Sequence, residues 1–135
     1  YRTFMKTNKK WSITKADLLQ FKKGSIGNEL GSFLHSHNFD LLAKAEKHDI
    51  FHIVTNFSTS VVDEIAMQFY LYGNGKRSIY LAFVIIIGTI FYFDKRAYFK
   101  QSYERGKTIV PIHNFNFYNN LDMELRIFKQ NHKLL

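Results

Sequence analysis

The stretch "KHDIFHIVTNFSTSVVDEIA" (residues 47–66) holds two mainly apolar runs on either side of the polar link "NFSTS". Ser60 stands where it can cap the helix that follows, and Asp63 comes three residues later as the partner of a capping box. This second helix is expected to run to about Tyr72, where "GNGK" ends it. Two helices joined by so short a link fold back on each other, so the stretch predicts an antiparallel helical hairpin.

The helix before the link carries two histidines on an apolar face. We expect this helix over Phe39–Asn56, in which Leu41, Ala45, His48 and His52 are spaced by four, three and four residues. This spacing places all four side chains on one side of an α-helix. The histidines therefore continue an apolar stripe that faces the rest of the protein.

The polar residues of the hairpin follow the pattern H-D-x-x-H-x11-E, made by His48, Asp49, His52 and Glu64. Two imidazoles four residues apart on a helix can reach the same cation. Asp49 either ligates that cation through a tilt or holds a ligand in place, and the returning helix brings Glu64 opposite His52. The four residues are therefore candidate metal ligands. The competing interpretation takes Asp63 and Glu64 only as acidic residues suited to a helix N-terminus.

Composition excludes several classes of protein. The chain has 135 residues, of which 46% are apolar, which suits a single domain over residues 1–135 with a real core. It has no cysteine, so disulfides, thiol nucleophiles and cysteine zinc sites are excluded. The net charge of +8 fits a nucleic acid, an anionic membrane or an anionic substrate. No basic segment carries a nucleic-acid-binding motif, so we expect no nucleic acid partner.

The rest of the chain reads as further helices. Short helices are expected over Lys15–Phe21 and Ile26–His35, and a last amphipathic one over Tyr118–Lys133, which gives an all-α bundle of about six helices. The apolar run Ile79–Phe93 is shorter than the roughly 20 residues of a membrane span. We interpret it as a helix that is buried in the core or lines an apolar cavity and continues through Tyr103, with a strand as the alternative.

The histidine motif resembles the signature of a known family, the fourth coenzyme Q (ubiquinone) biosynthesis protein and its bacterial relatives. Flanking stretches agree with that family in order and spacing from about Phe21 to the C-terminus. They are "GSIGNELGSFL" (residues 24–34), "HDIFHIVTNFSTSVVDEIA" (48–66), "YERGKTIVPI" (103–112) and "LDMELRIF" (121–128). The chain departs from the pattern at Asp63, where the family usually has Gly, and is thus similar to a divergent bacterial-type member.

The resemblance implies a metal site and an activity. Carried over by position, His48, Asp49, His52 and Glu64 would be the ligands of a divalent metal. Zinc suits this set best, iron and manganese fit as well, and magnesium less so because it prefers oxygen ligands. The family is linked to oxidative decarboxylation at ring carbon one of a polyprenyl hydroxybenzoate, so the chain is expected to be a metal-dependent decarboxylase (a lyase) of ubiquinone biosynthesis.

The resemblance also implies partners. Members of the family have a hydrophobic cavity for an isoprenoid tail, and the run 79–93 would form its wall, with Phe83, Ile86 and Ile90 as lipid-binding residues. Expected partners are a polyprenyl aromatic lipid, other quinone biosynthesis enzymes, an anionic membrane surface and a second copy of the chain. The protein would be cytoplasmic and peripheral on the inner face of the membrane.

Three other functions compete with this one. The first is a scaffold without catalysis, which binds a prenyl lipid and other enzymes of the pathway while a metal pins the helix hairpin. The second is a His-Asp metal-dependent phosphohydrolase, which would need His35 and Asp94 as further ligands. The third is a zinc peptidase, but Asp49 replaces the glutamate base of H-E-x-x-H and has a shorter reach.

Overall fold

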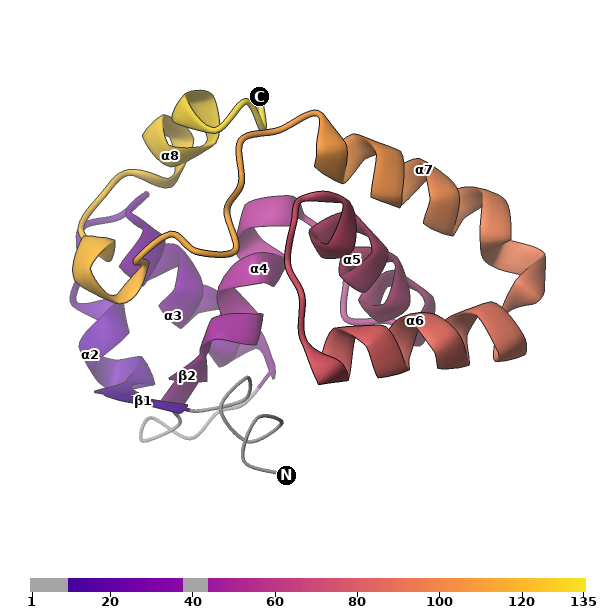
Figure 1. Ribbon diagram of the computed structural model, residues 1–135. Coiled ribbons are helices and arrows are strands. Elements are labelled where there is room, and N and C mark those ends of the chain that lie inside the picture. Colours follow the sequence, from indigo (N-terminus) through magenta and orange to yellow (C-terminus); the bar gives the residue numbers. More distant parts are fainter. Residues whose placement is uncertain (1–9, 38–43) are drawn as a thin grey trace.

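Figure 1 shows a computed structural model that describes residues 10–37 and 44–135. The architecture is all-α, as predicted, apart from one short antiparallel pair of strands. In the described residues the strands are β1 (Lys10–Thr14) and β2 (Lys44–Glu46), and the helices are α2 (Lys15–Leu19), α3 (Ile26–His37), α4 (Lys47–Thr55), α5 (Val61–Gly73), α6 (Ile79–Phe91), α7 (Arg96–Lys107) and α8 (Leu125–Asn131). Single 3₁₀ turns, η1 (Phe93–Lys95) and η2 (Tyr118–Asn120), precede α7 and α8. In Figure 1, α6 and α7 flank α5, while α2, α3, α4 and α8 lie together on the other side.

Polar side chains fix where three of the helices begin. Thr14 and Asp17 form a reciprocal capping box at the start of α2. The Ser60 hydroxyl accepts a hydrogen bond from the Asp63 backbone at the start of α5, as the sequence predicted, and Ser78 caps α6 in the same way. The helix hairpin therefore begins its return at the expected residue.

The helix that carries the histidines is shorter than predicted. It begins at Lys47 rather than Phe39, because Lys44–Glu46 are extended and pair with β1. The backbone N–H of Glu46 donates to the Asp49 carboxylate at 2.8 Å, which closes the first turn of α4. Ala45 is therefore not on the helical face of the histidines, and the predicted start of the helix, with Leu41, lies outside the described residues.

The apolar run also differs from its prediction. It ends at Phe91, and η1 separates it from α7, so one continuous helix through Tyr103 was wrong. The expected burial was wrong too: within α6 only Leu81 and Gly88 are buried, because the helix packs on α5 along one narrow side. No helix of the described chain is long and apolar enough to cross a bilayer.

The predicted C-terminal helix is broken into two pieces. Residues 118–120 form η2, and α8 begins only at Leu125. Between them the chain crosses the start of α3, where the Ile26 and Gly27 backbone N–H groups donate to the carbonyls of Met123 and Leu121. These tertiary hydrogen bonds replace the helical ones, and Phe128 of α8 is fully buried in the core.

The chain packs α5 against α7 through two glycines. A Cβ on Gly106 would lie 2.0 Å from the Tyr70 carbonyl oxygen, and one on Gly73 would lie 2.1 Å from that of Tyr103. Asn74, which ends α5 and is 5% exposed, accepts from the Ile112 N–H at 2.7 Å and donates to the Gly106 carbonyl at 3.1 Å. The end of α5 is therefore fastened both to α7 and to the connector after it.

Candidate metal centre

Three converging side chains come from the two arms of the helix hairpin. His48 and His52 lie one turn apart on α4, and Glu64 lies in the first turn of α5. Asn56 ends α4 in the left-handed conformation, with φ of 64°, and this lets the chain turn back at once. The sharp turn and the Ser60 cap together set the position of Glu64 opposite both imidazoles.

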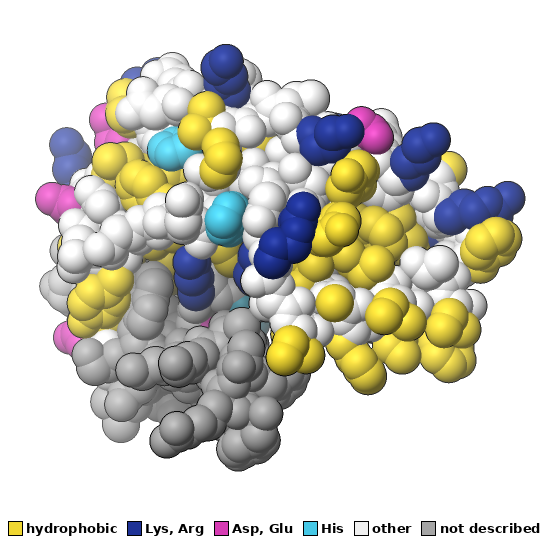
Figure 2. Space-filling view, in the orientation of Figure 1, with side chains coloured by type: hydrophobic (Ala, Val, Ile, Leu, Met, Phe, Trp, Pro, Cys, Tyr) yellow, Lys and Arg dark blue, Asp and Glu magenta, His cyan; other side chains and the backbone are white. Residues whose placement is uncertain are grey.

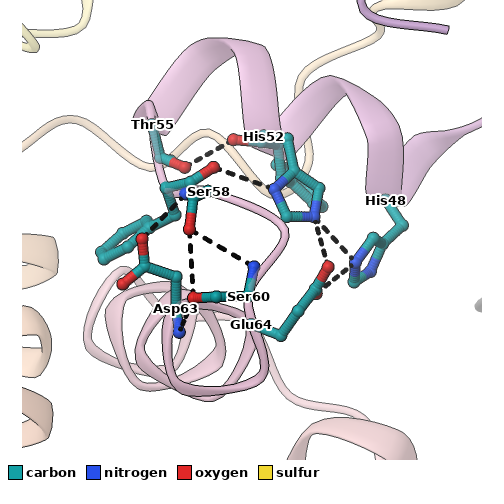
Figure 3. Close-up of polar contacts among 9 residues, drawn as sticks. His48, His52, Thr55, Ser58, Ser60, Asp63 and Glu64 are labelled. Atoms are coloured by element: carbon teal, nitrogen blue, oxygen red, sulfur yellow. Dashed lines mark hydrogen bonds and ion pairs between the residues drawn. The ribbon is translucent and has the colours of Figure 1, made fainter. Parts of the chain in front are cut away.

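The three side chains point at one another (Figure 3). The Nε2 atoms of His48 and His52 each lie 2.8 Å from a different oxygen of the Glu64 carboxylate. The same two nitrogens are 3.3 Å apart. Each residue thus offers one ligand atom, and these atoms all lie within 4.8 Å of one another. His48, His52 and Glu64 therefore form a group that could hold a metal ion.

The surroundings of His52 fix which of its nitrogens faces the group. Its Nδ1 lies 3.0 Å from the Phe57 carbonyl oxygen, which accepts the Nδ1 hydrogen, so in the neutral ring the lone pair is on Nε2, the atom that faces Glu64. The ring is 4% exposed and stacks on Phe33 at 5.4 Å between centroids. The imidazole is thus oriented before any ligand arrives, as metal-binding histidines usually are.

Electrostatics favours a cation at this point. Burial alone would raise the pKa of Glu64, but the hydrogen bonds and charges of His48 and His52 outweigh it and lower that pKa to about 2. Burial lowers the pKa of His52, and the bonds to Glu64 and the Phe57 carbonyl reverse this, so the pKa is raised overall. The carboxylate therefore stays charged, and protons occupy the place that a divalent ion would take.

The donor set fits a zinc-like ion. Two neutral imidazole nitrogens and one carboxylate are the ligands of many catalytic zinc sites, which leave a fourth position open. Iron and manganese accept the same donors, whereas magnesium prefers oxygen alone. The chemistry of the residues present therefore agrees with the predicted class of cofactor and leaves the identity of the metal open.

Asp49 does not join this group. Its carboxylate accepts the Glu46 N–H at the start of α4, and the converging atoms belong to the other three residues of the motif. A residue that directly follows a helical ligand lies about 100° around the helix, which explains the different direction. In this structure Asp49 holds the turn from which His48 projects, and its role as a ligand stays a prediction.

Asp63 has a contact that the sequence did not reveal. Its carboxylate accepts the Ser58 N–H at 2.9 Å and the Tyr98 hydroxyl of α7 at 2.7 Å. Figure 3 shows it directed away from Glu64. These hydrogen bonds lower the pKa of Asp63 against the effect of burial, which alone would raise it. Asp63 therefore ties the link of the hairpin to α7, and no local sequence pattern could have named Tyr98.

Hollows lie beside His52 and between α5, α6 and α7. A cleft of about 870 Å³ reaches His52 and is lined by apolar Phe33, Phe57 and Leu125, by basic Arg126 and Lys129, and by acidic Glu29 and Glu124. A smaller, almost wholly apolar one of about 280 Å³ lies between α5, α6 and α7. The sequence predicted an apolar cavity walled by the run 79–93, and Ile85 and Thr89 of that run line the smaller hollow. It did not predict the cleft at His52, because residues from distant segments form its walls.

The predicted lipid-binding residues are largely exposed. Phe83, Ile86 and Ile90 are 63%, 58% and 64% exposed on the outer side of α6. Figure 2 shows the row of hydrophobic side chains along the edge where Figure 1 draws this helix. They form an open apolar ridge, and Phe83 also lines an open hollow of about 410 Å³ with Val61 and Ile65 of α5. Their role as lipid-binding residues stays a prediction.

Comparisons with known proteins point to the fold. No family model matches the chain, and no curated protein matches it in sequence. Among solved structures it is similar to a protein from Nostoc punctiforme whose assignment to ubiquinone biosynthesis is provisional, with a TM-score of 0.69 and 14% identity. The match covers 97% of this chain and 72% of that one. The chain therefore shares its fold with a protein that is assigned, provisionally, to ubiquinone biosynthesis.

Proposed function

We propose that the chain is a metal-dependent, prenyl-lipid-binding protein of ubiquinone biosynthesis, acting in the oxidative decarboxylation of a polyprenyl hydroxybenzoate at ring carbon one. The observation that carries the proposal is the convergence of His48, His52 and Glu64, from a motif resembling that of the family, in a fold shared with the Nostoc protein. A bound divalent metal would supply Lewis acidity toward the ring carboxylate or a neighbouring phenolic oxygen.

The residues around the metal centre have distinct tasks in this proposal. Glu64 and the two histidines hold the ion, and the Phe57 carbonyl keeps the ring of His52 in one orientation. The cleft beside His52 offers apolar walls for part of the lipid, and two basic and two acidic side chains also line it. Replacing a ring carboxylate by hydroxyl is a two-electron oxidation, so the reaction needs an electron acceptor such as O2.

The direct test is turnover. The metal-loaded protein, given a prenylated 4-hydroxybenzoate and O2, should release CO2 from the ring carboxylate. The variant Glu64→Gln keeps the size of the side chain but loses its charge. It should lower the rate of CO2 release at least about 100-fold, because the protein then binds the metal more weakly. His37→Ala, an exposed histidine of α3 outside the group, serves as the control and should keep the full rate. Substrate binding without CO2 release in the metal-loaded wild type would contradict the catalytic proposal.

The alternative of a scaffold follows from the same site. In this role the metal would stabilise the hairpin while the protein binds a prenyl lipid and other enzymes of the pathway. Binding of the prenylated hydroxybenzoate without turnover favours it. The phosphohydrolase alternative lacks its further ligands, because the group found in the described residues includes neither His35 nor Asp94.

The open ridge on α6 suggests how the protein meets its lipid. We propose that Ile79, Phe83, Ile86 and Ile90 enter the surface of an anionic bilayer, where the neighbouring Lys95, Arg96 and Lys100 contact the headgroups. The protein would then be cytoplasmic and peripheral on the inner face of the membrane. An exposed apolar surface on this scale also suits a second copy of the chain or another enzyme of the pathway.

Sedimentation with vesicles distinguishes these partners. The double variant Phe83→Ser/Ile90→Ser should lower the binding to phosphatidylglycerol-containing vesicles about tenfold or more, since two exposed apolar side chains are lost. Ile127→Ser, a matched apolar residue on the surface of α8, should have little effect. Equal vesicle binding by the wild type and the double variant would contradict the proposal, and a change from dimer to monomer would assign the ridge to a second copy.

A further inference from the structure

A group of basic side chains lies outside the metal centre. It consists of Lys47, Lys76 and His113, which we call the basic cluster, with Arg77 next to it. The residues come from three segments: the first turn of α4, the link between α5 and α6, and the connector after α7. Figure 2 shows Lys, Arg and His side chains gathered near the middle of this face.

Both lysines of the cluster lie against one aromatic ring. The Nζ atoms of Lys47 and Lys76 are 5.8 Å and 5.0 Å from the centroid of Phe51, a core residue that is 1% exposed. Lys47 also donates a hydrogen bond to the His113 carbonyl. Two ammonium groups from different parts of the chain are thus held at the same place.

The backbone that carries the cluster is firmly fixed. Asn74 binds the Ile112 N–H and the Gly106 carbonyl, which places the link before α6 against the connector. In that link Gly75 has a φ of +113° and would bring a Cβ within 3.2 Å of the His113 ring. The basic residues therefore meet on a rigid frame and not at the ends of mobile loops.

No carboxylate within the described residues neutralises the lysines. The ion pairs found there join Glu64 to the two metal-centre histidines and Lys107 to Glu104. The acidic residues next to Lys47 in the sequence are Glu46, which directly precedes α4, and Asp49, whose carboxylate accepts the Glu46 N–H. Burial, and then the charge of Lys47, lower the pKa of Lys76 to about 8. The pKa of His113 is lowered as well, by burial first and then by Lys47, Lys76 and Arg77.

Like charges held together, with no ion pair to a carboxylate in the part of the chain that the structure describes, are typical of a site for an anion. We propose that the basic cluster binds an oxyanion, with Lys47 and Lys76 as its two charged donors. The shared chemistry is that of a phosphoryl group or a carboxylate. Four residues after Lys76, Tyr80 presents its ring edge to His48 at 6.5 Å between centroids, so the cluster borders the metal centre. The proposal does not require that the metal centre be catalytic.

Calorimetry of the EDTA-treated protein at low salt tests this site. One titration uses inorganic phosphate and the other benzoate, which separates the two sources of an oxyanion. Binding of at least one is expected, and Lys76→Gln should weaken it about tenfold or more, because a charge-assisted donor is lost. Lys47→Gln should act in the same direction. Added sodium chloride should weaken binding in the wild type.

Control variants make each outcome decisive. Lys76→Arg keeps the charge and should restore most of the affinity, while Lys107→Gln, an exposed lysine of α7, should leave it unchanged. His52→Ala removes a metal ligand and should still bind the oxyanion, so the outcome is separate from that of the proposed function. The proposal is overturned by a wild type that binds neither probe, or by folded Lys47→Gln and Lys76→Gln variants that bind as tightly as the wild type.

Discussion

Zinc should raise the melting temperature of the wild-type protein by about 10 °C when its free concentration is about 100 times the dissociation constant. The ligand atoms of His48, His52 and Glu64 come together only when α4 and α5 are packed, so the metal binds the folded state almost alone. At this excess the binding contributes about 2.7 kcal/mol, and a chain of this length converts that energy into the stated shift.

The variant His52→Ala should lose most of this shift. It removes the ligand that is most buried and best oriented, through its Phe57 hydrogen bond. His37→Ala is the matched control, because His37 is an exposed histidine that binds the Phe33 carbonyl and lies outside the group. Differential scanning fluorimetry with and without zinc measures both. A zinc shift of equal size in wild type and His52→Ala would place the metal elsewhere.

Acid should weaken the effect of zinc. The pKa of His52 is raised above its usual value near 6.5, so in the metal-free protein a proton occupies its ring up to a higher pH than usual. Zinc needs the neutral imidazole and must displace this proton. The shift in melting temperature at a fixed zinc concentration should therefore be smaller at about pH 6 than at about pH 8.

Much of the metal centre follows from local sequence. Ser60 marks the start of α5, and the spacing of His48 and His52 places both rings on one side of α4 whether the helix begins at residue 39 or 47. Because the link is so short, the first turn of α5, with Glu64, must lie close to the end of α4. The hairpin and the convergence of these three side chains thus depend on interactions between residues close in sequence, and such interactions can be predicted from sequence patterns.

The start of α4 depends on a partner far along the chain. Strand β2 exists because it pairs with β1. Lys10 lies opposite Glu46 and Thr14 opposite Lys44, so the paired residues are 30 to 36 positions apart in the sequence. Helical periodicity over residues 39–56 looked continuous, and no local feature showed the competing strand. Asp49 was affected in the same way: once the helix begins at Lys47, this residue becomes part of its cap.

Burial of α6 could not be read from its composition. A run such as Ile79–Phe93 is expected inside a protein, yet exposed apolar side chains occur wherever a surface meets lipid or another chain. What decides the matter is how many neighbours the fold provides, and in the described residues α6 packs chiefly on α5. Gly88 allows that contact, since a Cβ there would lie 2.4 Å from the Ile65 side chain.

The variant Gly106→Ala should destabilise the protein by about 3 kcal/mol or more, even though alanine is the better helix former. Helix propensity alone predicts a gain of about 1 kcal/mol at this position of α7. The new methyl group would lie 2.0 Å from the carbonyl oxygen of Tyr70 and 3.2 Å from the backbone N of Asn74. These are backbone atoms of α5 and cannot rotate away, so the two helices must separate. Helix propensity predicts a more stable variant and the clash predicts a less stable one, so the sign of the measured change decides between them.

Urea unfolding of Gly106→Ala, Gly73→Ala and the double variant measures the effect. Gln101→Ala, an exposed position on the same helix, should change the free energy of unfolding by no more than about 0.5 kcal/mol. Gly73→Ala should act like Gly106→Ala, because its methyl group would lie 2.1 Å from the Tyr103 carbonyl oxygen on the facing helix. One separation of α5 from α7 relieves both clashes, so the double variant should cost less than the sum of the single ones. Additive losses would show that each glycine is needed for a local reason and that the close approach of the two helices is not what they share.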